Sequence, residues 1–122
     1  PRMRRLSSLL GCLSAVLCGV GGCAGGLGPA LDAFHDGRLP QAAAELRSLE
    51  PRIGTAPEGE QARYALYRGL AELGLGNARV AERWLACAWH ADARDPRLFD
   101  AKEHGQLLAA WRSLGHLPGE AG

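Results

Sequence analysis

The chain has 122 residues, which leaves room for one small domain. Hydrophobic residues make up 47% of it, but much of this share is alanine, and such a composition favours closely packed helices over strands. The formal net charge is +1, and without Arg2, Arg4 and Arg5 near the N-terminus only 11 of the 14 basic residues remain against 13 acidic ones. No nucleic-acid partner is expected, because a nucleic-acid-binding domain carries a basic surface.

Residues 1–22 have the pattern of an export signal. Arg4 and Arg5 precede an uncharged, largely apolar run from Leu6 to Val20, as in the basic and hydrophobic regions of a secretory signal. The run is about 15 residues long, whereas a membrane-spanning helix needs about 20. We therefore expect a signal peptide rather than a membrane span.

The apolar run ends in an aliphatic residue, two small residues and a cysteine, Val20-Gly21-Gly22-Cys23. This sequence resembles the lipobox of bacterial lipoproteins, and the resemblance implies that the thiol of Cys23 receives diacylglycerol. By the same resemblance, Ala24 after the cysteine favours the periplasmic face of the outer membrane. The alternatives are an ordinary signal peptide cleaved near Gly22, which would release a secreted periplasmic protein, and a signal segment that stays uncleaved as an anchor.

A sequence repeat runs through the rest of the chain. One constant spacing relates Gly37, Gly76 and Gly115, each of which lies between two helical patterns, as a helix-ending residue with a left-handed backbone does. We expect a turn at each of the three glycines. The same period relates Ala42 with Ala81, Leu46 with Leu85, Pro57 with Pro96, Ala62 with Ala101, and Leu75 with Leu114.

The expected elements, in chain order, begin with two helices of one hairpin, from Gly28 to Asp36 and from Pro40 to Glu50. A third helix precedes Gly76, and its apolar surface is wide enough to predict burial on two sides. A fourth, through Ala81 to Ala88, packs back against the third. Asp95-Pro96 then offers an N-cap and a first-turn proline for a last helix reaching about residue 114.

Residues 62–96 resemble a tetratricopeptide repeat, and residues 28–51 resemble the latter part of another. The chain departs from that family in its period, about 39 residues instead of about 34. The resemblance implies an all-α fold of antiparallel helical hairpins stacked as a short solenoid over residues 28–122, after a signal peptide (1–22) and a lipidated cysteine with its tether (23–27). The matching positions are Gly69, Leu75-Gly76-Asn77, Ala81, Leu85 and Ala88 in one repeat, and Gly37, Ala42, Leu46 and Pro51 in the other.

Tetratricopeptide arrays bind extended peptides or partner proteins along the concave face formed by the first helix of each hairpin. This resemblance implies that Arg63 pairs with a carboxylate of a partner, with an ordinary solvated arginine as the alternative. The residues implied to face the groove are Phe34, His35, Arg63, Leu66, Leu70 and Leu73.

Neither a cofactor nor catalysis is expected. Cys87 and His90 lie one helical turn apart, but zinc takes four ligands and nothing nearby completes the set, so a packed cysteine beside a surface histidine is the expectation. The chain contains no haem-attachment, phosphate-loop or zinc-protease motif. Trp84 is expected on the hairpin seam and Trp89 against the last helix, with an exposed ligand-anchoring aromatic as the alternative.

These patterns predict an envelope-anchored lipoprotein that serves as a protein–protein interaction module or scaffold in an envelope assembly or secretion system. The alternative is a structural subunit of an oligomeric envelope complex. The fold by itself does not choose between the two, because function resides in the site that a fold carries.

Overall fold

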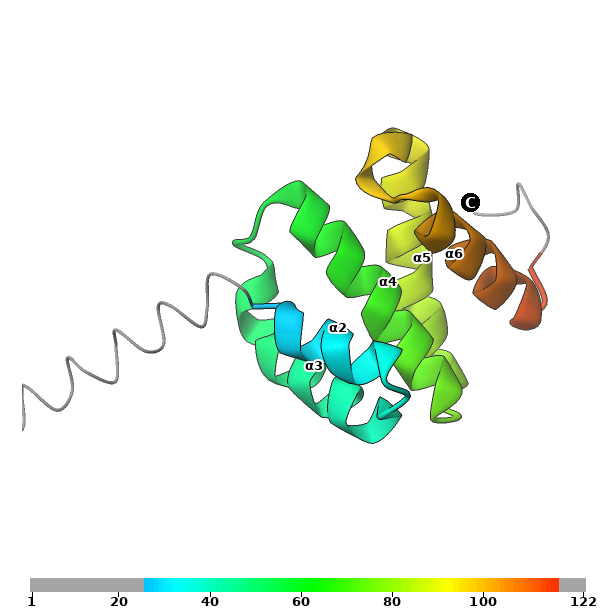
Figure 1. Cartoon of the computed structure of the whole chain (residues 1–122). Helices are drawn as coiled ribbons and strands as arrows, with labels where there is room; N and C mark the ends of the chain where they lie inside the picture. The colour runs from blue at the N-terminus through cyan, green and yellow to red at the C-terminus, as the bar shows by residue number, and fades with distance from the viewer. Residues whose placement is uncertain (1–25, 117–122) are drawn as a thin grey trace, which may run out of the picture.

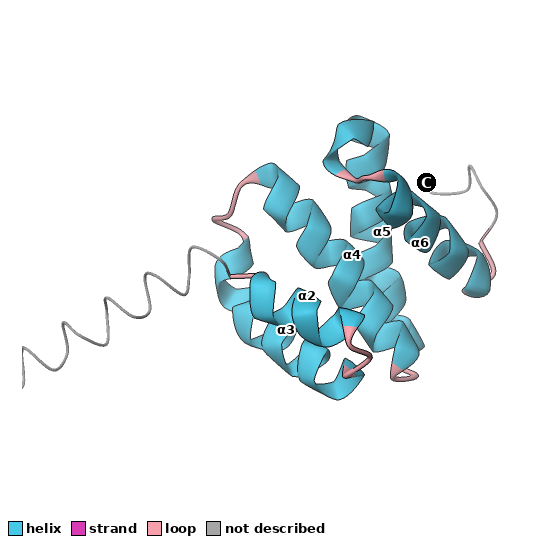
Figure 2. Ribbon diagram, in the orientation of Figure 1, coloured by secondary structure: helices cyan, strands magenta, loops and turns pink. Residues whose placement is uncertain are grey.

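The computed structural model describes residues 26–116. These residues form five α-helices and one short 3-10 helix, with no strand among them (Figures 1 and 2), which confirms the expected all-α fold. In chain order the elements are α2 (Gly28–His35), α3 (Leu39–Ile53), α4 (Glu58–Gly74), α5 (Ala78–Arg94), η1 (Pro96–Leu98) and α6 (Ala101–Ser113).

Three helices end at a glycine with a left-handed backbone. The φ angles are +80° at Gly37, +87° at Gly76 and +92° at Gly115, a region that side chains with a Cβ rarely adopt. After each glycine, the next N–H donates to the carbonyl five positions earlier, over 2.9 to 3.2 Å, which is the Schellman pattern. The three turns predicted from the repeat period are therefore confirmed.

The helices pack mainly against their neighbours in the chain. α2 packs on α3, α3 on α4, α4 on α5, and α5 on α6, while α4 also contacts α2 and α6. Within residues 26–116, no close backbone contact joins α2 to α5 or α6, or α3 to α5. Figure 1 shows α4 between the α2–α3 pair and the α5–α6 pair. The predicted burial of α4 on two sides is confirmed.

α4 and α5 approach each other closely at Gly69. A Cβ atom built on Gly69 would lie 2.5 Å from Cγ of Leu85 and 3.2 Å from its backbone N, so a larger residue forces the two helices apart. Leu85, Ala81 and Ala88 are fully buried in this seam, and small residues there allow the short interhelical distance.

A buried polar network joins α3 to α4. Glu72, whose side chain is 1% exposed, accepts hydrogen bonds from Arg47, Arg68 and Asn77 at 2.8 to 2.9 Å. Arg68 also donates to Glu50 at 2.8 Å and lies over the ring of Trp84, 5.2 Å from its centroid. Both oxygens of the buried carboxylate therefore have donors, as burial of a charge requires.

The start of the last helix differs from the prediction. Asp95 caps η1 instead, with its Oδ1 accepting from the N–H of Arg97 at 3.1 Å. Phe99 then adopts an extended backbone and buries its side chain, which interrupts the helical run. α6 begins after Asp100, which forms a capping box with Glu103. The prediction that Asp95-Pro96 opens this helix was wrong.

The tryptophans pack between helices. Trp84 meets Tyr64 of α4 edge to face, with centroids 5.1 Å apart, and Trp89 stacks on Trp111 of α6 with centroids 5.3 Å apart. His116 also stacks on Trp111, with centroids 4.1 Å apart. Both packing expectations, the hairpin seam for Trp84 and the last helix for Trp89, are confirmed.

Candidate binding face

Aromatic rings from two helices meet on the side of the molecule formed by α2, α4 and α6, here called the α2–α4–α6 face. Phe34 and His35, at the end of α2, have ring centroids 5.3 and 5.9 Å from that of Tyr67 on α4, both edge to face. His35 is exposed, Phe34 is half-buried and Tyr67 is buried. Two of the predicted contact residues therefore share one cluster, centred on a tyrosine that the prediction did not include.

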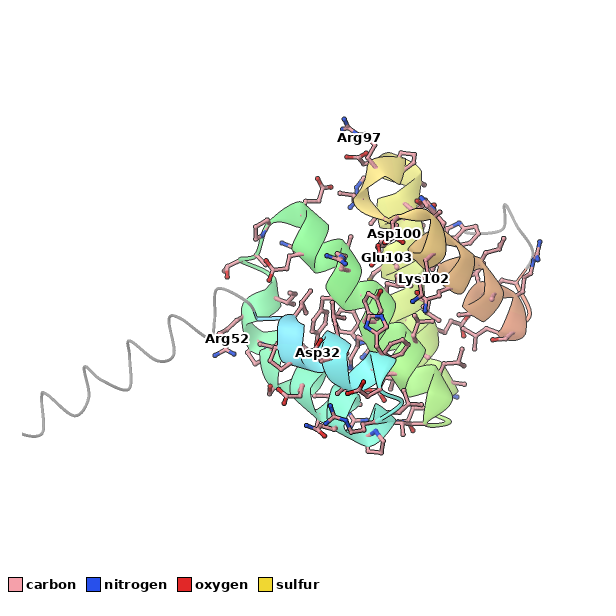
Figure 3. All side chains as sticks on the ribbon, in the orientation of Figure 1. Asp32, Arg52, Arg97, Asp100, Lys102 and Glu103 are labelled. Carbon is pink, nitrogen blue, oxygen red and sulfur yellow. The ribbon has the colours of Figure 1, made fainter. Side chains whose placement is uncertain are left out.

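Glu103 of α6 extends this cluster to the third helix. Its Oε2 accepts from Tyr67 Oη at 3.0 Å and from Arg63 Nε at 3.1 Å, while Oε1 accepts from the N–H of Asp100 at 3.0 Å. Figure 3 shows Asp100 and Glu103 at the start of α6. Burial of the phenol, together with its hydrogen bond to this carboxylate, raises the pKa of Tyr67 to about 12, so Tyr67 remains a donor at neutral pH.

Arg63 reaches the face but has a partner inside the chain. Its side chain is 44% exposed, whereas that of Glu103, with which it pairs, is 4% exposed. This internal ion pair was not predicted from the sequence, and contact of the exposed part of Arg63 with a partner's carboxylate stays a prediction. The reason is tertiary, because Glu103 is distant in the sequence and arrives only when α6 packs on α4.

The three leucines predicted to line the groove differ in how deeply their side chains are buried. Leu66 is fully buried, so the prediction that it contacts a partner was wrong. It precedes Tyr67 by one residue, or about 100° around the helix, and this rotation turns it into the core. Leu70 and Leu73 are half-buried and pack against the core, so each exposes only part of its side chain.

The prediction did not include Tyr67 and Glu103, and the sequence contains a recognisable signal only for Glu103. Asp100 and Glu103 have the spacing of a capping box, which places Glu103 in the first turn of a helix. The hydrogen bond from Tyr67, 36 residues away, has no counterpart in any local pattern.

A hollow of about 550 Å³ lies on the α2–α4–α6 face, beside the start of α4. Leu27 and Leu31 line it from the N-terminal side and Leu98 of η1 from the other, with Glu60 and Arg63 of α4 between them. Apolar walls with a few polar groups are typical of sites for peptides and small molecules.

A second hollow, of about 340 Å³, lies between the end of α3, the first half of α4 and the part of α5 from Trp84 to Arg94. Cys87 and His90 line it together with Trp84. Cys87 is exposed, so the expectation of a packed cysteine was wrong, while His90 lies on the surface as expected. Among residues 26–116, no three His, Cys, Asp or Glu side chains are grouped so as to hold a metal ion.

The predicted lipidation site, Cys23, and the predicted signal peptide lie outside the described residues. None of the helices between residues 26 and 116 is both long enough and apolar enough to cross a membrane.

Comparison of the chain with protein-family models, with curated proteins and with solved structures found no match. The comparisons therefore assign no family, and the function is inferred from the sequence patterns and from the geometry of the face.

Proposed function

We propose that the chain is an envelope lipoprotein, anchored through Cys23, whose helical domain is a short tetratricopeptide-like interaction module. Its partner is a protein of an envelope assembly or secretion system, recognised through an extended segment. The lipid holds the module at the membrane and raises its concentration near envelope partners, so that a weak contact suffices.

The pattern of helix contacts supports the repeat assignment. Each helix packs on the helices one or two places along the chain, as in repeat arrays, where each repeat contacts only its neighbours. The equally spaced left-handed glycines each follow one helix of the proposed repeats, with Gly37 after α2, Gly76 after α4 and Gly115 after α6. Small residues at Gly69, Ala81 and Ala88 occupy the close seam between α4 and α5.

The observation that carries the binding proposal is the hollow on the α2–α4–α6 face. Its leucines present apolar surface, and Glu60 and Arg63, which pairs with Glu103, add polar groups to its lining. An extended segment fits this arrangement if it inserts an apolar side chain between the leucines and carries polar groups on either side.

Photo-crosslinking in intact envelopes tests this proposal. A photoreactive amino acid at Leu31 or at Leu98 should give the same protein adduct, because both positions line the hollow. The control is Arg83, which is exposed on α5, a helix that contributes no residue to the hollow. An adduct of equal yield at Arg83, or no common adduct at the two leucine positions, contradicts the assignment of the face.

The anchor has a separate test. The Cys23→Ser variant should lose metabolic labelling with a fatty acid and should no longer sediment with membranes, because serine lacks the thiol that forms the thioether. Retention of labelled lipid on this variant would show that Cys23 is not the site.

One observation favours the alternative, a structural subunit of an oligomeric complex. Ala101, Gly105 and Ala109 are all exposed and recur every four residues along α6, and a Cβ at Gly105 would meet nothing within 4 Å. Light scattering on the purified mature domain separates the proposals, since a monomer favours the interaction module and a stable oligomer favours the subunit.

A further inference from the structure

Four helix ends lie close together near Gly26, the first described residue. They are the start of α2, the end of α3, the start of α4 and the end of α5. Gly26 lines one hollow with Ile53 and Ala56, next to the last turn of α3, and Glu58 at the start of α4 lies 3.6 Å from Arg94 at the end of α5. This side of the domain is here called the entry end. The opposite helix ends carry the three glycine turns.

The proposed anchor restricts how this domain meets a membrane. Cys23 precedes Leu27 by four residues, which span at most about 14 Å when fully extended. α4, with 17 residues, is about 25 Å long. A lipid on Cys23 therefore keeps the entry end within reach of the bilayer surface, whereas the glycine turns are one helix length further from the anchor.

The chemistry of the entry end suits phospholipid headgroups. Arg52 is exposed and pairs with no carboxylate among residues 26–116, and the Arg97 side chain is 90% exposed. Guanidinium groups donate paired hydrogen bonds to phosphate oxygens, and their long stems let the charge reach past neighbouring atoms. Figure 3 labels Arg52 in the last turn of α3 and Arg97 at the tip formed by η1.

Acidic side chains at the entry end weaken its attraction to an anionic surface. Asp95 pairs with Arg97 and Glu58 with Arg94, while Glu60 lines the neighbouring hollows. The cations and anions are thus balanced in number, so general attraction to an anionic surface is weak. The tether brings the surface close, and the arginines then bind individual phosphates.

We propose that the entry end rests on the phospholipid surface, with Arg52 and Arg97 bonded to lipid phosphates and the glycine turns directed away from the membrane. This inference rests on the proposed lipid anchor at Cys23. It also places the hollow lined by Leu27 and Leu98 next to the bilayer, so the partner's segment is itself close to the membrane.

The experiment uses the lipidated mature protein in vesicles of phosphatidylethanolamine and phosphatidylglycerol. In a Cys87→Ser background, a single fluorescent label is placed at Thr55→Cys in the entry end or at Ala78→Cys beside the Gly76 turn, both exposed positions. Lipids with a nitroxide headgroup should quench the label at position 55 at least several-fold more than the label at position 78. Equal quenching, or none at position 55, overturns the proposal and leaves the entry end free for a protein partner.

Charge reversal tests the two arginines. Arg52→Glu with Arg97→Glu should reduce quenching at position 55, whereas Arg112→Glu, which changes an exposed arginine of α6, should leave it unchanged. Quenching that persists in the double variant overturns the role of the arginines. Absence of lipid on Cys23, measured by mass, instead rejects the proposed anchor, so the two failures are distinguishable.

Discussion

Arg47 of α3 binds Glu72 of α4 through two parallel hydrogen bonds, from Nε to Oε2 at 2.9 Å and from Nη2 to Oε1 at 2.8 Å. Such bidentate pairs are among the strongest ion pairs in proteins. Glu72 is almost fully buried, whereas Arg47 is half exposed. Loss of Arg47 would therefore leave a buried charge at Glu72 with fewer donors, whereas loss of Glu72 would leave Arg47 solvated.

Replacing Glu72 with alanine should lower the free energy of unfolding by about 3 kcal/mol, because buried Arg68 then keeps, among the described residues, only one carboxylate partner, the half-exposed Glu50. In a domain of this size the melting temperature should fall by more than about 10 °C. Thermal unfolding followed by circular dichroism measures the change. Glu58→Ala is the matched control, since its exposed pair with Arg94 at 3.6 Å contributes little. Equal melting temperatures for the two variants would contradict the network's importance.

The stability of the domain should depend on pH through the same carboxylate. Hydrogen bonds from Arg47, followed by those from Asn77 and Arg68, lower the pKa of Glu72 from 4.5 to about 2, against the opposing effect of burial. Because the folded pKa lies below the unfolded value, the stabilisation is present above the unfolded pKa of 4.5 and is lost as the pH falls towards 2. Denaturant titrations at several pH values should show a shallower acid loss for Glu72→Gln than for wild type. Parallel pH profiles would count against this assignment.

Two glycines on different helices should respond oppositely to alanine. Gly69→Ala should destabilise the domain by about 1 to 3 kcal/mol, because its Cβ would overlap fully buried Leu85. Gly105→Ala, in the interior of α6 with no atom within 4 Å of the new Cβ, should stabilise it by about 0.5 to 1 kcal/mol. Urea unfolding of both variants tests the helix seam, and a stabilising Gly69→Ala would be inconsistent with it.

Arg63→Glu should lower the melting temperature by several degrees. Exposure alone predicts almost no effect for a surface arginine, but the substitution places a second carboxylate beside buried Glu103 and removes one of its donors. Differential scanning fluorimetry compares this variant with Arg112→Glu, whose arginine is exposed on α6 and should tolerate the change. An unchanged melting temperature in Arg63→Glu would mean that the pair with Glu103 is not maintained in solution.

Local patterns and the repeat period were enough to predict an all-helical chain, the three turns and the seam between α4 and α5, but they gave the wrong start for α6. Gly37, Gly76 and Gly115 can be recognised because a left-handed helix end depends on a few adjacent residues. The helical period likewise places Trp89 on a different side from Trp84, and this predicts its contact with the last helix. Each of these features follows from a helical period, a helix-end pattern or the repeat period, all of which can be read along the sequence.

Packing between helices far apart in the chain determines which side chains of the binding face are exposed and which groups they pair with. The sequence places Arg63 on the first helix of a repeat and predicts the surface around it, but Glu103 binds Arg63 and Tyr67 only when α6 docks on α4. The repeat pattern predicts Leu66 at the surface, yet it is buried, because the rotation of α4 among its neighbours is set by all of them together. The accessibility and ionic partners of a side chain are properties of this tertiary packing, since the contacting groups lie far apart in the chain and no local pattern records which of them meet.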